Sequence, residues 1–298
     1  MAQLQLFALF YYFAFLAVAD PLLTVLQREG FTEFAQRLEG PDGEAVLSAC
    51  PDMIIFAPTN AAIVRANSCG LGRRDDGTEV PNPEQHATSQ PKMDLRRQSG
   101  VTPPLGGVAL MNLLDDPEFV NLGPGQNSSV VQKDVANAAL GVVYSGLGDS
   151  VQISGLDIPY DCGVIRPISG VFTLPALLSE TLADLGTTNA LSALERTGLL
   201  ADLDNRTSIT FLAPDNSAFS EISGDDELAQ ALRQQVLLGP PAYSPLLVDG
   251  ASYDTLAGTT VTVSMRDANY YIGDALILAS DAVMKNGVTH VVDKVCAN

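Results

Sequence analysis

Histidine is the side chain most often used as a general base, and this chain contains two, His86 and His290. A nucleophilic triad needs a histidine within hydrogen-bond reach of both a nucleophile and a carboxylate. His86 lies in a stretch of loop-like composition, and His290 lies in a β-branched run that predicts a strand. The sequence contains no G-x-S-x-G elbow and no H-E-x-x-H pair. These patterns argue against an enzyme, and we expect no catalytic residue.

Paired carboxylates are the next candidates, as general acids or as metal ligands. The pairs Asp115–Asp116 and Asp225–Asp226 each precede a stretch of helical character. Acidic residues at a helix N-terminus are favoured by the helix dipole, so a structural role explains both pairs. The sequence also has no calcium loop of alternating Asp or Asn ligands. We therefore expect neither a metal nor a cofactor.

A strand–turn–helix motif occurs twice and organises the chain. Ile209 to Ile222, ITFLAPDNSAFSEI, is matched by Met53 to Ile63, MIIFAPTNAAI, at a constant offset of 156 residues. The β-branched and aromatic residues predict a strand, the proline a break, and Asp215 or Asn216 the cap of the following helix. The recurring residues are Ala57, Pro58, Asn60 and Ala62, matched by Ala213, Pro214, Asn216 and Ala218.

Helices precede this motif in both halves. Apolar residues at helical spacing in Pro21 to Leu38 resemble those of Asn189 to Leu203. We align these segments at an offset of 168, which places a longer, less compact connection in the first half around Gly40–Gly43. Short β-branched pieces follow the motif in each half and predict an antiparallel sheet. Each half then closes with a related strand, Gly163–Ile168 or Gly287–Val292.

The first half also carries a predicted insertion of about residues 70–104. Clustered prolines, five basic residues and a lack of apolar periodicity are typical of an exposed loop. A tolerated surface insertion explains it, and a proteolysis site or a basic docking loop is the functional alternative. The insertion accounts for most of the length difference between the two halves.

Length and composition agree with two domains in a secreted protein. The 298 residues are 46% hydrophobic and 17% charged, enough for two cores of ~150-residue domains. A net charge of −19 disfavours nucleic acid and anionic membranes as partners. Residues 1–19 read as a signal peptide cleaved after Ala19, with a retained anchor as the alternative. The sequons at Asn127 and Asn205 are glycosylation candidates.

Four cysteines fit an oxidising compartment: Cys50, Cys69, Cys162 and Cys296. Four cysteines allow three pairings. We favour Cys50–Cys69, because the two flank the first copy of the motif. Cys162 and Cys296 then remain as partners, each beside the last strand of its half. Their spacing lacks the paired C-x₂₋₄-C units of a zinc site.

The segments FLAPDNSAF and NGVTHVVDKV resemble the two signatures of the fasciclin domain. The first half is similar, with FAPTNAAI and CGVIRPISGVF, and NLGPGQ and DIPYDCGVI resemble secreted fungal members with two such domains. The resemblance implies an α+β fold, with two tandem domains at 20–174 and 175–298. Each would be a wedge of antiparallel sheets with helices packed on one side.

The resemblance also bears on single residues. His290, in the last strand, is then a buried hydrogen-bonding partner, and Arg166 stands at the equivalent place in the first half. Receptor-binding members often carry a Tyr-His pair in mid-domain, where this chain has Gln234–Gln235 and the first half has no recognisable counterpart. Receptor binding through that pair is therefore not expected.

The functional expectation is a secreted, non-catalytic adhesion module. Its partners would be extracellular-matrix or cell-wall components, cell-surface proteins or glycans, with no nucleic acid and no membrane span in the mature chain. Two alternatives stay open. One is a secreted enzyme or small-ligand carrier that uses an interdomain cleft, and the other is a spacer without a specific ligand.

Overall fold

The structure of the chain is a computed structural model. The structure describes residues 20–68, 81–89, 107–135, 138–219, 224–267 and 269–295. The predicted signal peptide, Cys69 and Cys296 lie outside these residues. Among the described residues, none of the helices is long and apolar enough to cross a bilayer.

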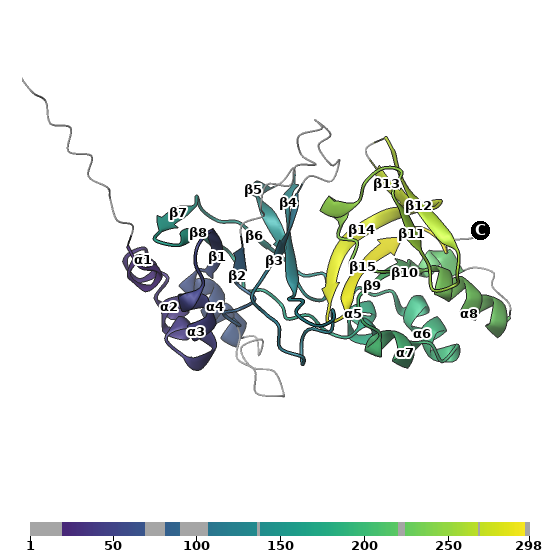
Figure 1. Cartoon of the computed structure of the whole chain (residues 1–298), viewed down its shortest axis with the longest axis horizontal. Helices are drawn as coiled ribbons and strands as arrows, with labels where there is room; N and C mark the ends of the chain where they lie inside the picture. The colour runs from purple at the N-terminus through teal and green to yellow at the C-terminus, as the bar shows by residue number, and fades with distance from the viewer. Residues whose placement is uncertain are drawn as a thin grey trace, which may run out of the picture.

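The chain folds into two repeats that lie side by side (Figure 1). The first repeat consists of α1 (Leu22–Arg28), α2 (Thr32–Leu38), η1 (Pro41–Gly43), α3 (Glu44–Ser48), β1 (Met53–Pro58), α4 (Asn60–Ser68), β2 (Ala87–Ser89), β3 (Val108–Met111), β4 (Ser129–Val135), β5 (Ala138–Tyr144), β6 (Ser150–Gln152), β7 (Ile158–Tyr160) and β8 (Gly163–Ile168). The second repeat consists of α5 (Leu178–Asp184), α6 (Thr188–Arg196), α7 (Leu200–Asn205), β9 (Ile209–Pro214), η3 (Asn216–Phe219), α8 (Asp225–Gln234), β10 (Val236–Leu238), η4 (Ser244–Leu246), β11 (Ser252–Asp254), β12 (Thr260–Arg266), β13 (Asn269–Ile272), β14 (Ala275–Met284) and β15 (Gly287–Val292).

Both repeats have the same sheet topology. In the first repeat, the strand orders are β2-β1-β8-β7 and β3-β4-β5-β6, and single bridges at Thr88–Asn112 and Ile153–Ile168 join the two sheets. In the second repeat, β14 is long enough to belong to both layers, so that one seven-stranded sheet runs β10-β9-β15-β14-β13-β12-β11. A bridge between Leu237 and Thr255 brings its two ends together. The predicted α+β class with two tandem repeats is confirmed.

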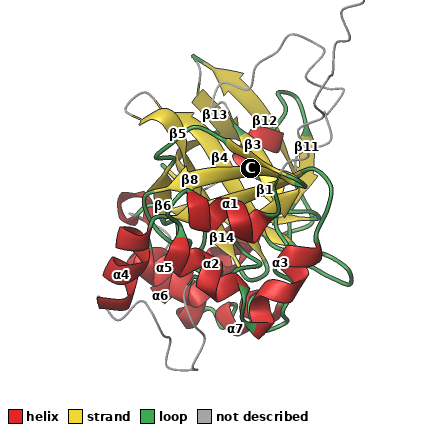
Figure 2. Cartoon of the chain, turned by 90° about the vertical axis from the view of Figure 1, so that its left-hand side faces the viewer, coloured by secondary structure: helices red, strands yellow, loops and turns green. Residues whose placement is uncertain are grey.

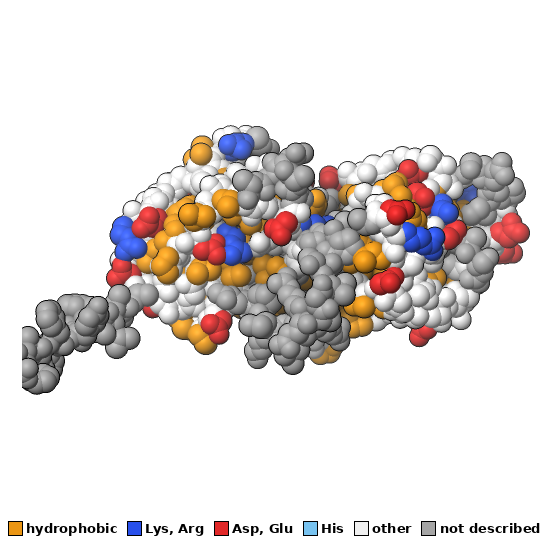
Figure 3. All heavy atoms as spheres, turned by 90° about the horizontal axis from the view of Figure 1, so that it is seen from above, with side chains coloured by type: hydrophobic (Ala, Val, Ile, Leu, Met, Phe, Trp, Pro, Cys, Tyr) orange, Lys and Arg blue, Asp and Glu red, His pale blue; other side chains and the backbone are white. Residues whose placement is uncertain are grey.

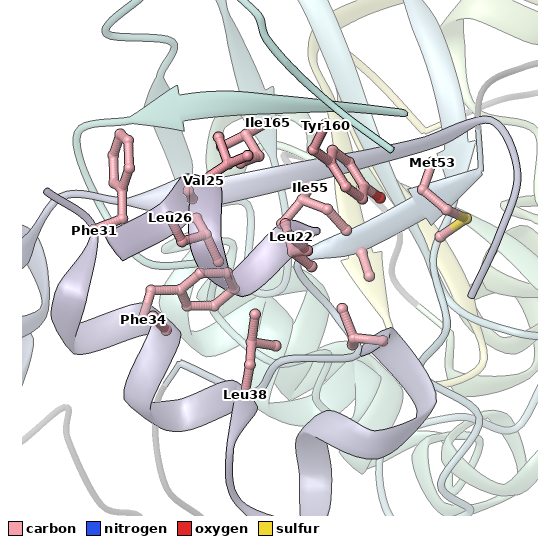
Figure 4. Packing of buried hydrophobic residues seen from close by; sticks show 14 of the residues in the cluster. Leu22, Val25, Leu26, Phe31, Phe34, Leu38, Met53, Ile55, Tyr160 and Ile165 are labelled. Carbon is pink, nitrogen blue, oxygen red and sulfur yellow. The ribbon is translucent and has the colours of Figure 1, made fainter. Parts of the chain in front are cut away.

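The motif strand lies at the centre of each repeat. All six residues of β1 are buried, and so are all six of β9, because helices cover one face and sheet the other. Met53, Ile55 and Ala57 pack in the helix-side cluster, whereas Ile54 and Phe56 pack towards the second sheet. Figure 4 shows Leu26 and Phe34 of the helices beside Ile55 and Ile165 of the strands. In Figure 2 the helices gather on one side of the strands.

The helical alignment at offset 168 is wrong. Asp161 N–H donates to Asp20 C=O (3.1 Å) just before α1, and Lys285 N–H donates to Ala176 C=O (2.8 Å) just before α5. Asp20 and Ala176 are 156 residues apart, the same offset as the motif. The correspondence is therefore α1 with α5 and α2 with α6, without a gap. The three identical residues behind the other alignment are a chance match between amphipathic helices.

The predicted insertion is shorter than residues 70–104, because residues 81–89 belong to the fold. β2 pairs antiparallel with β1 as β10 pairs with β9, and Ile55↔Ala87 corresponds to Phe211↔Val236. Gln85, His86, Ala87 and Thr88 are buried. The prediction of a loop is wrong for this segment, because a three-residue strand among prolines lacks the periodicity that would predict it.

Candidate functional site

The polar residues Asp215 and Asn216 of the motif stabilise the turn and hydrogen-bond the start of a neighbouring helix. Asp215 Oδ1 accepts from the N–H groups of Ser217 (2.8 Å) and Ala218 (3.1 Å), which confirms Asp215 as a cap. Asn216 has a different role from the predicted cap. Its Oδ1 accepts from Asn189 N–H at the start of α6 (2.9 Å), and its Nδ2 donates to Gly186 C=O (2.8 Å).

Asn60 makes the same contact in the first repeat. Its Oδ1 accepts from Glu33 N–H at the start of α2 (3.1 Å), and its Nδ2 donates to Thr32 Oγ1 (2.9 Å). Each motif asparagine thus satisfies an otherwise unpaired N–H in the first turn of the helix that precedes the strand. The repeated sequence is explained by folding, since it ties the helical layer to the central strand.

The cysteine pairing predicted from the sequence is wrong, because Cys50 is bonded to Cys162. β1 and β8 are parallel neighbours with Met53 opposite Gly163, so the residues just before the two strands lie together, with Cα atoms 5.0 Å apart. In the second repeat, Asn286 takes the place of Cys162. Its Nδ2 donates to the carbonyls of Leu203 (2.7 Å) and Arg206 (2.6 Å), which holds the same corner without a covalent bond.

A buried group of polar residues joins the two repeats around His290. Lys133 of β4 reaches from the first repeat to Asp281 of β14, with Nζ 2.5 Å from Oδ2, and also donates to Ser280 Oγ at 2.6 Å. Ser244 donates to Asp281 through its N–H (2.7 Å) and its hydroxyl. His290 Nδ1 accepts from Asp281 N–H (3.1 Å), and its Nε2 donates to Ala242 C=O (2.9 Å).

Burial and partners fix the charges in this group. Burial lowers the pKa of His290, and a ring that accepts at Nδ1 and donates at Nε2 is neutral. Burial acts to raise the pKa of Asp281, but the positive charge of Lys133, with hydrogen bonds from Lys133 and Ser244, holds it below its usual value. Asp281 is thus an ion paired with Lys133.

This group of polar residues can fix the position of the two repeats. It lacks access for a substrate and a nucleophile paired with a base. Asp281 and His290 are both fully buried, so a substrate has no access to either. The Ser244 hydroxyl donates to the Asp281 carboxylate, whereas the two ring nitrogens of His290 bond to backbone groups. His290 is therefore not placed to act as a base for the Ser244 hydroxyl. His290 is a buried hydrogen-bonding partner, as predicted.

Around this group, the repeats bury an apolar seam. Val131 of β4 packs with Tyr243, Val283 and Val288 of the second repeat. Val283 N–H donates to Ser145 C=O in the β5–β6 loop (3.2 Å), and Asn121 N–H donates to Lys285 C=O (2.6 Å). A seam with core packing and backbone hydrogen bonds fixes the orientation of the two repeats.

His86 is a core residue, contrary to its prediction as part of a loop. Its Nδ1 donates to Phe56 C=O (2.8 Å), its Nε2 accepts from Phe172 N–H (3.2 Å), and its ring stacks on that of Phe172 with centroids 4.3 Å apart. Burial lowers its pKa to about 4, so the ring is neutral at pH 7. No described acid or nucleophile hydrogen-bonds this ring.

A comparison with known families identifies the second repeat. Residues 185–297 match the model of the fasciclin domain, which spans α6 to β15 and includes the motif strand and the strand of His290. Residues 185–297 form a fasciclin domain. The resemblance inferred from FLAPDNSAF and NGVTHVVDKV is confirmed, and the first repeat has the same strand order around its own motif.

Curated relatives carry the same family name. The chain is 31% identical over 189 residues to a fasciclin-like arabinogalactan protein of Arthroderma benhamiae, covering 61% of this chain and 44% of that protein. It is 28% identical over 182 residues to the fasciclin-like arabinogalactan protein CTB11 of Cercospora beticola, covering 59% and 49%. This chain therefore spans less than half the length of these two relatives. A solved FAS1 domain pair from the insect cell adhesion molecule fasciclin I aligns with 91% of this chain and 97% of its own, at 14% identity and a TM-score of 0.42.

The fasciclin fold also corrects the expectation about the Tyr-His position. Gln235 C=O accepts from Leu212 N–H (2.8 Å), and His86 C=O accepts from Phe56 N–H (2.9 Å). His86 is thus the counterpart of Gln235, and the first repeat has Gln85–His86 where none was recognised. The side chains of His86 and Gln235 are both buried.

The two sequons lie at different places in the fold. Asn205 is the exposed last residue of α7, and its Nδ2 donates to Ala201 C=O (2.7 Å). Asn127 is partly exposed just before β4, next to the buried Ser128.

Proposed function

We propose that this chain is a secreted, non-catalytic adhesion module that binds cell-wall or extracellular-matrix components. It is proposed to consist of a signal peptide, residues 1–19, and two fasciclin-like domains at 20–174 and 175–298. The carrying observation is a fasciclin domain whose His290 and buried Asp281, together with Lys133 of the first repeat, are engaged in holding the fold together. Relatives named fasciclin-like arabinogalactan proteins support a place at the cell wall.

The proposed partners are matrix or cell-wall polymers and cell-surface proteins or glycans. The net charge of −19 makes nucleic acid an unfavourable partner. Asn205 is proposed as a glycosylation site, because its side chain is exposed at the end of a helix. Asn127 is proposed as a second site. An enzyme or carrier function would need an interdomain cleft, and the seam there is filled by Val131, Tyr243 and the Lys133–Asp281 pair.

A binding assay tests the proposal directly. The chain is expressed with its own N-terminus in a secreting eukaryotic host, purified from the medium and labelled. Retention is measured on washed fungal cell-wall polysaccharide and on immobilised matrix proteins. An unrelated acidic protein of similar net charge is the control, because it separates specific retention from ionic adsorption. Retention above that control is expected, and retention equal to it on both supports would refute the proposal.

A further inference from the structure

The contact between the repeats uses two different faces of the same fold. The first repeat offers the outer face of its β3–β5 sheet, here named the sheet face, with Ala109, Val131, Lys133 and Tyr144. The second repeat offers the face of β14 and β15 near its bulge, here named the edge face, with Asp281, Val283, Val288 and His290. Each repeat therefore has one face in contact and one open. The open faces are the edge face of the first repeat and the sheet face of the second.

Register identifies the counterparts on the open edge face. Ile158↔Ile165 and Tyr160↔Gly163 in the first repeat correspond to Ala282↔Thr289 and Met284↔Gly287 in the second. Asp157, Pro159 and Arg166 therefore stand where the buried interface has Asp281, Val283 and His290. The two edge faces differ at Pro159 and Arg166, and the shared aspartate has a different counter-charge in each.

The first difference removes a backbone donor. Val283 N–H donates across the seam to Ser145 C=O at 3.2 Å. Its counterpart Pro159 is exposed and has no N–H. A proline on an open edge is a common means of preventing another chain from pairing there.

The second difference concerns the counter-charge of the aspartate, which the open edge face supplies from its own repeat. Asp281 obtains its counter-charge from Lys133 of the other repeat. Asp157 is instead held within its own repeat by Arg166, whose Nε and Nη2 donate to Oδ1 (2.7 Å) and Oδ2 (2.5 Å). A bidentate pair of this kind satisfies the carboxylate, so a docking lysine would gain nothing from Asp157.

The third difference makes the open sheet face polar. By the register of β3–β4 and β11–β12, Val131 corresponds to Thr262 and Lys133 to Ser264. Thr262 is exposed and hydrogen-bonds Ser252 across the strands (3.1 Å). Docking on such a face would bury little apolar surface. The face also lacks a counterpart of Lys133, the lysine that pairs with Asp281 in the contact between the repeats.

The fourth difference shortens the loop that reaches across the seam. In the first repeat, β5 and β6 end their pairing at Tyr144↔Ser150, and residues 145–149 form the loop that accepts from Val283. In the second repeat, pairing continues to Ile272↔Ala275, which leaves a tight turn at Gly273–Asp274. The second repeat therefore has no equivalent arm.

From these four differences we propose that the repeat-to-repeat contact cannot propagate, so that this chain does not bind a second copy of itself and its adhesion is heterophilic. This proposal rests on the adhesive function proposed above. The open edge face still exposes apolar surface, with Leu156 77% exposed. Figure 3 shows hydrophobic side chains gathered on the first repeat with charged groups among them. That surface is left free for a partner of other chemistry than the chain itself.

Self-association of the full secreted chain tests the proposal. Sedimentation is measured up to about 100 µM, a range that detects contacts with a micromolar Kd, and beads coated with the chain are scored for clustering. A monomer and dispersed beads are expected. Self-association in either assay would overturn the heterophilic assignment, and Leu156→Asp would then report whether the open edge face carries it.

A gain-of-contact variant tests the differences that lie in the side chains at positions 159, 166 and 264. Pro159→Val, Arg166→His and Ser264→Lys together give the open faces the residues of the buried interface. We expect this triple variant to form head-to-tail oligomers at concentrations where Ser264→Lys alone stays monomeric. A triple variant that is folded by circular dichroism and still monomeric would refute the sealing role of Pro159, Arg166 and Ser264.

The outcomes separate this proposal from the adhesive function. A monomer that is retained on wall or matrix supports both. Retention together with self-association keeps the function and overturns the heterophilic assignment. A monomer that is retained on neither support refutes the adhesive function. In that case, the oligomeric state of the triple variant alone tests whether the open faces are sealed.

Discussion

Position 86 buries a histidine where the second repeat buries Gln235, and this difference has a consequence for pH dependence. The pKa of His86 is about 4 in the folded chain, against 6.5 when exposed. Because the unfolded state binds the proton more tightly, stability is complete above pH 6.5 and is lost as the pH falls towards 4. At 1.36 kcal/mol per unit, this loss is on the order of 3 kcal/mol.

His86→Gln places the residue of the second repeat in the first. A glutamine can donate to Phe56 C=O and accept from Phe172 N–H, so the fold should be kept. We expect the difference in unfolding free energy between pH 7 and pH 4 to shrink by most of those 3 kcal/mol. Urea titrations at pH 7, 5.5 and 4 measure it. Burial also lowers the pKa of His290, so its contribution to the pH dependence of the unfolding free energy should remain in the variant. An unchanged pH dependence would contradict the burial of His86.

A second residue-scale prediction concerns the asparagine of the motif. Asn216→Ala removes the acceptor for Asn189 N–H and the donor to Gly186 C=O, and because both bonds are exposed we expect a loss of about 0.5–1.5 kcal/mol. Asn216→Asp keeps the acceptor and should cost less. Asn189 N–H should also exchange faster with deuterium in the alanine variant. Equal stability of the two variants would show that the contact to the helix start contributes nothing.

At the scale of elements, each repeat secures the corner between its first and last parallel strands by different chemistry. The Cys50–Cys162 bond closes a loop of 112 residues, whereas Asn286 uses two hydrogen bonds to carbonyls. A disulfide typically stabilises by about 2–4 kcal/mol through the entropy of the unfolded chain, and a loop of this length favours the upper end of that range. Cys50→Ser with Cys162→Ser should therefore destabilise the first repeat by that amount.

Asn286→Ala is the matched variant in the second repeat, and we expect it to cost about 1–3 kcal/mol. The two losses separate in a reductant series: dithiothreitol should destabilise the wild type and Asn286→Ala, and leave the cysteine double variant unchanged. Guanidinium titrations with and without reductant measure both. A reductant effect on the cysteine double variant would show that Cys50–Cys162 is not the stabilising bond.

The contrast between these elements also explains what the sequence could predict. The strand, proline break and cap of Ile209–Ile222 are local features, so residue types within a few positions were sufficient. The disulfide depends on which strands become neighbours, since Cys50 and Cys162 meet only after β1 and β8 pair. His86 is buried by Phe34, Phe56 and Phe172, which come from three distant segments. Its own neighbours in sequence, mostly polar residues and prolines, indicated a loop.

The relation between the repeats was predictable in outline and wrong in detail. The motif and the last strands share enough identity to set the offset of 156 and the end of each repeat. The helices share only their amphipathic period, so three matching residues were enough to suggest a false offset. The contact between the repeats could not be predicted, because Lys133 and Asp281 are ordinary charged residues until the fold buries them together.

At the scale of the whole molecule, the Lys133–Asp281 pair should decide whether the two repeats unfold together. Lys133→Met removes the counter-charge and leaves Asp281 buried and ionised, which costs about 3–5 kcal/mol. We expect the wild type to unfold in a single transition and the variant in two. The substitution weakens the contact between the repeats and leaves the core of each repeat unchanged. Lys133→Met with Asp281→Asn should recover part of the loss, since the asparagine carries no charge and its side-chain oxygen can still accept from Ser244 N–H.

Arg166→Met supplies the matched control for this experiment. It breaks the Asp157–Arg166 pair on the open edge face, where the two side chains are 38% and 17% exposed and no described residue of the second repeat takes part. This variant should cost less than Lys133→Met, since water still screens the remaining charge, and unfolding should stay a single transition. Differential scanning calorimetry gives the number of transitions and their enthalpies for all four proteins. If Lys133→Met unfolds in one transition with the stability of Arg166→Met, the buried pair does not couple the repeats, and the apolar seam of Val131, Tyr243, Val283 and Val288 must do so alone.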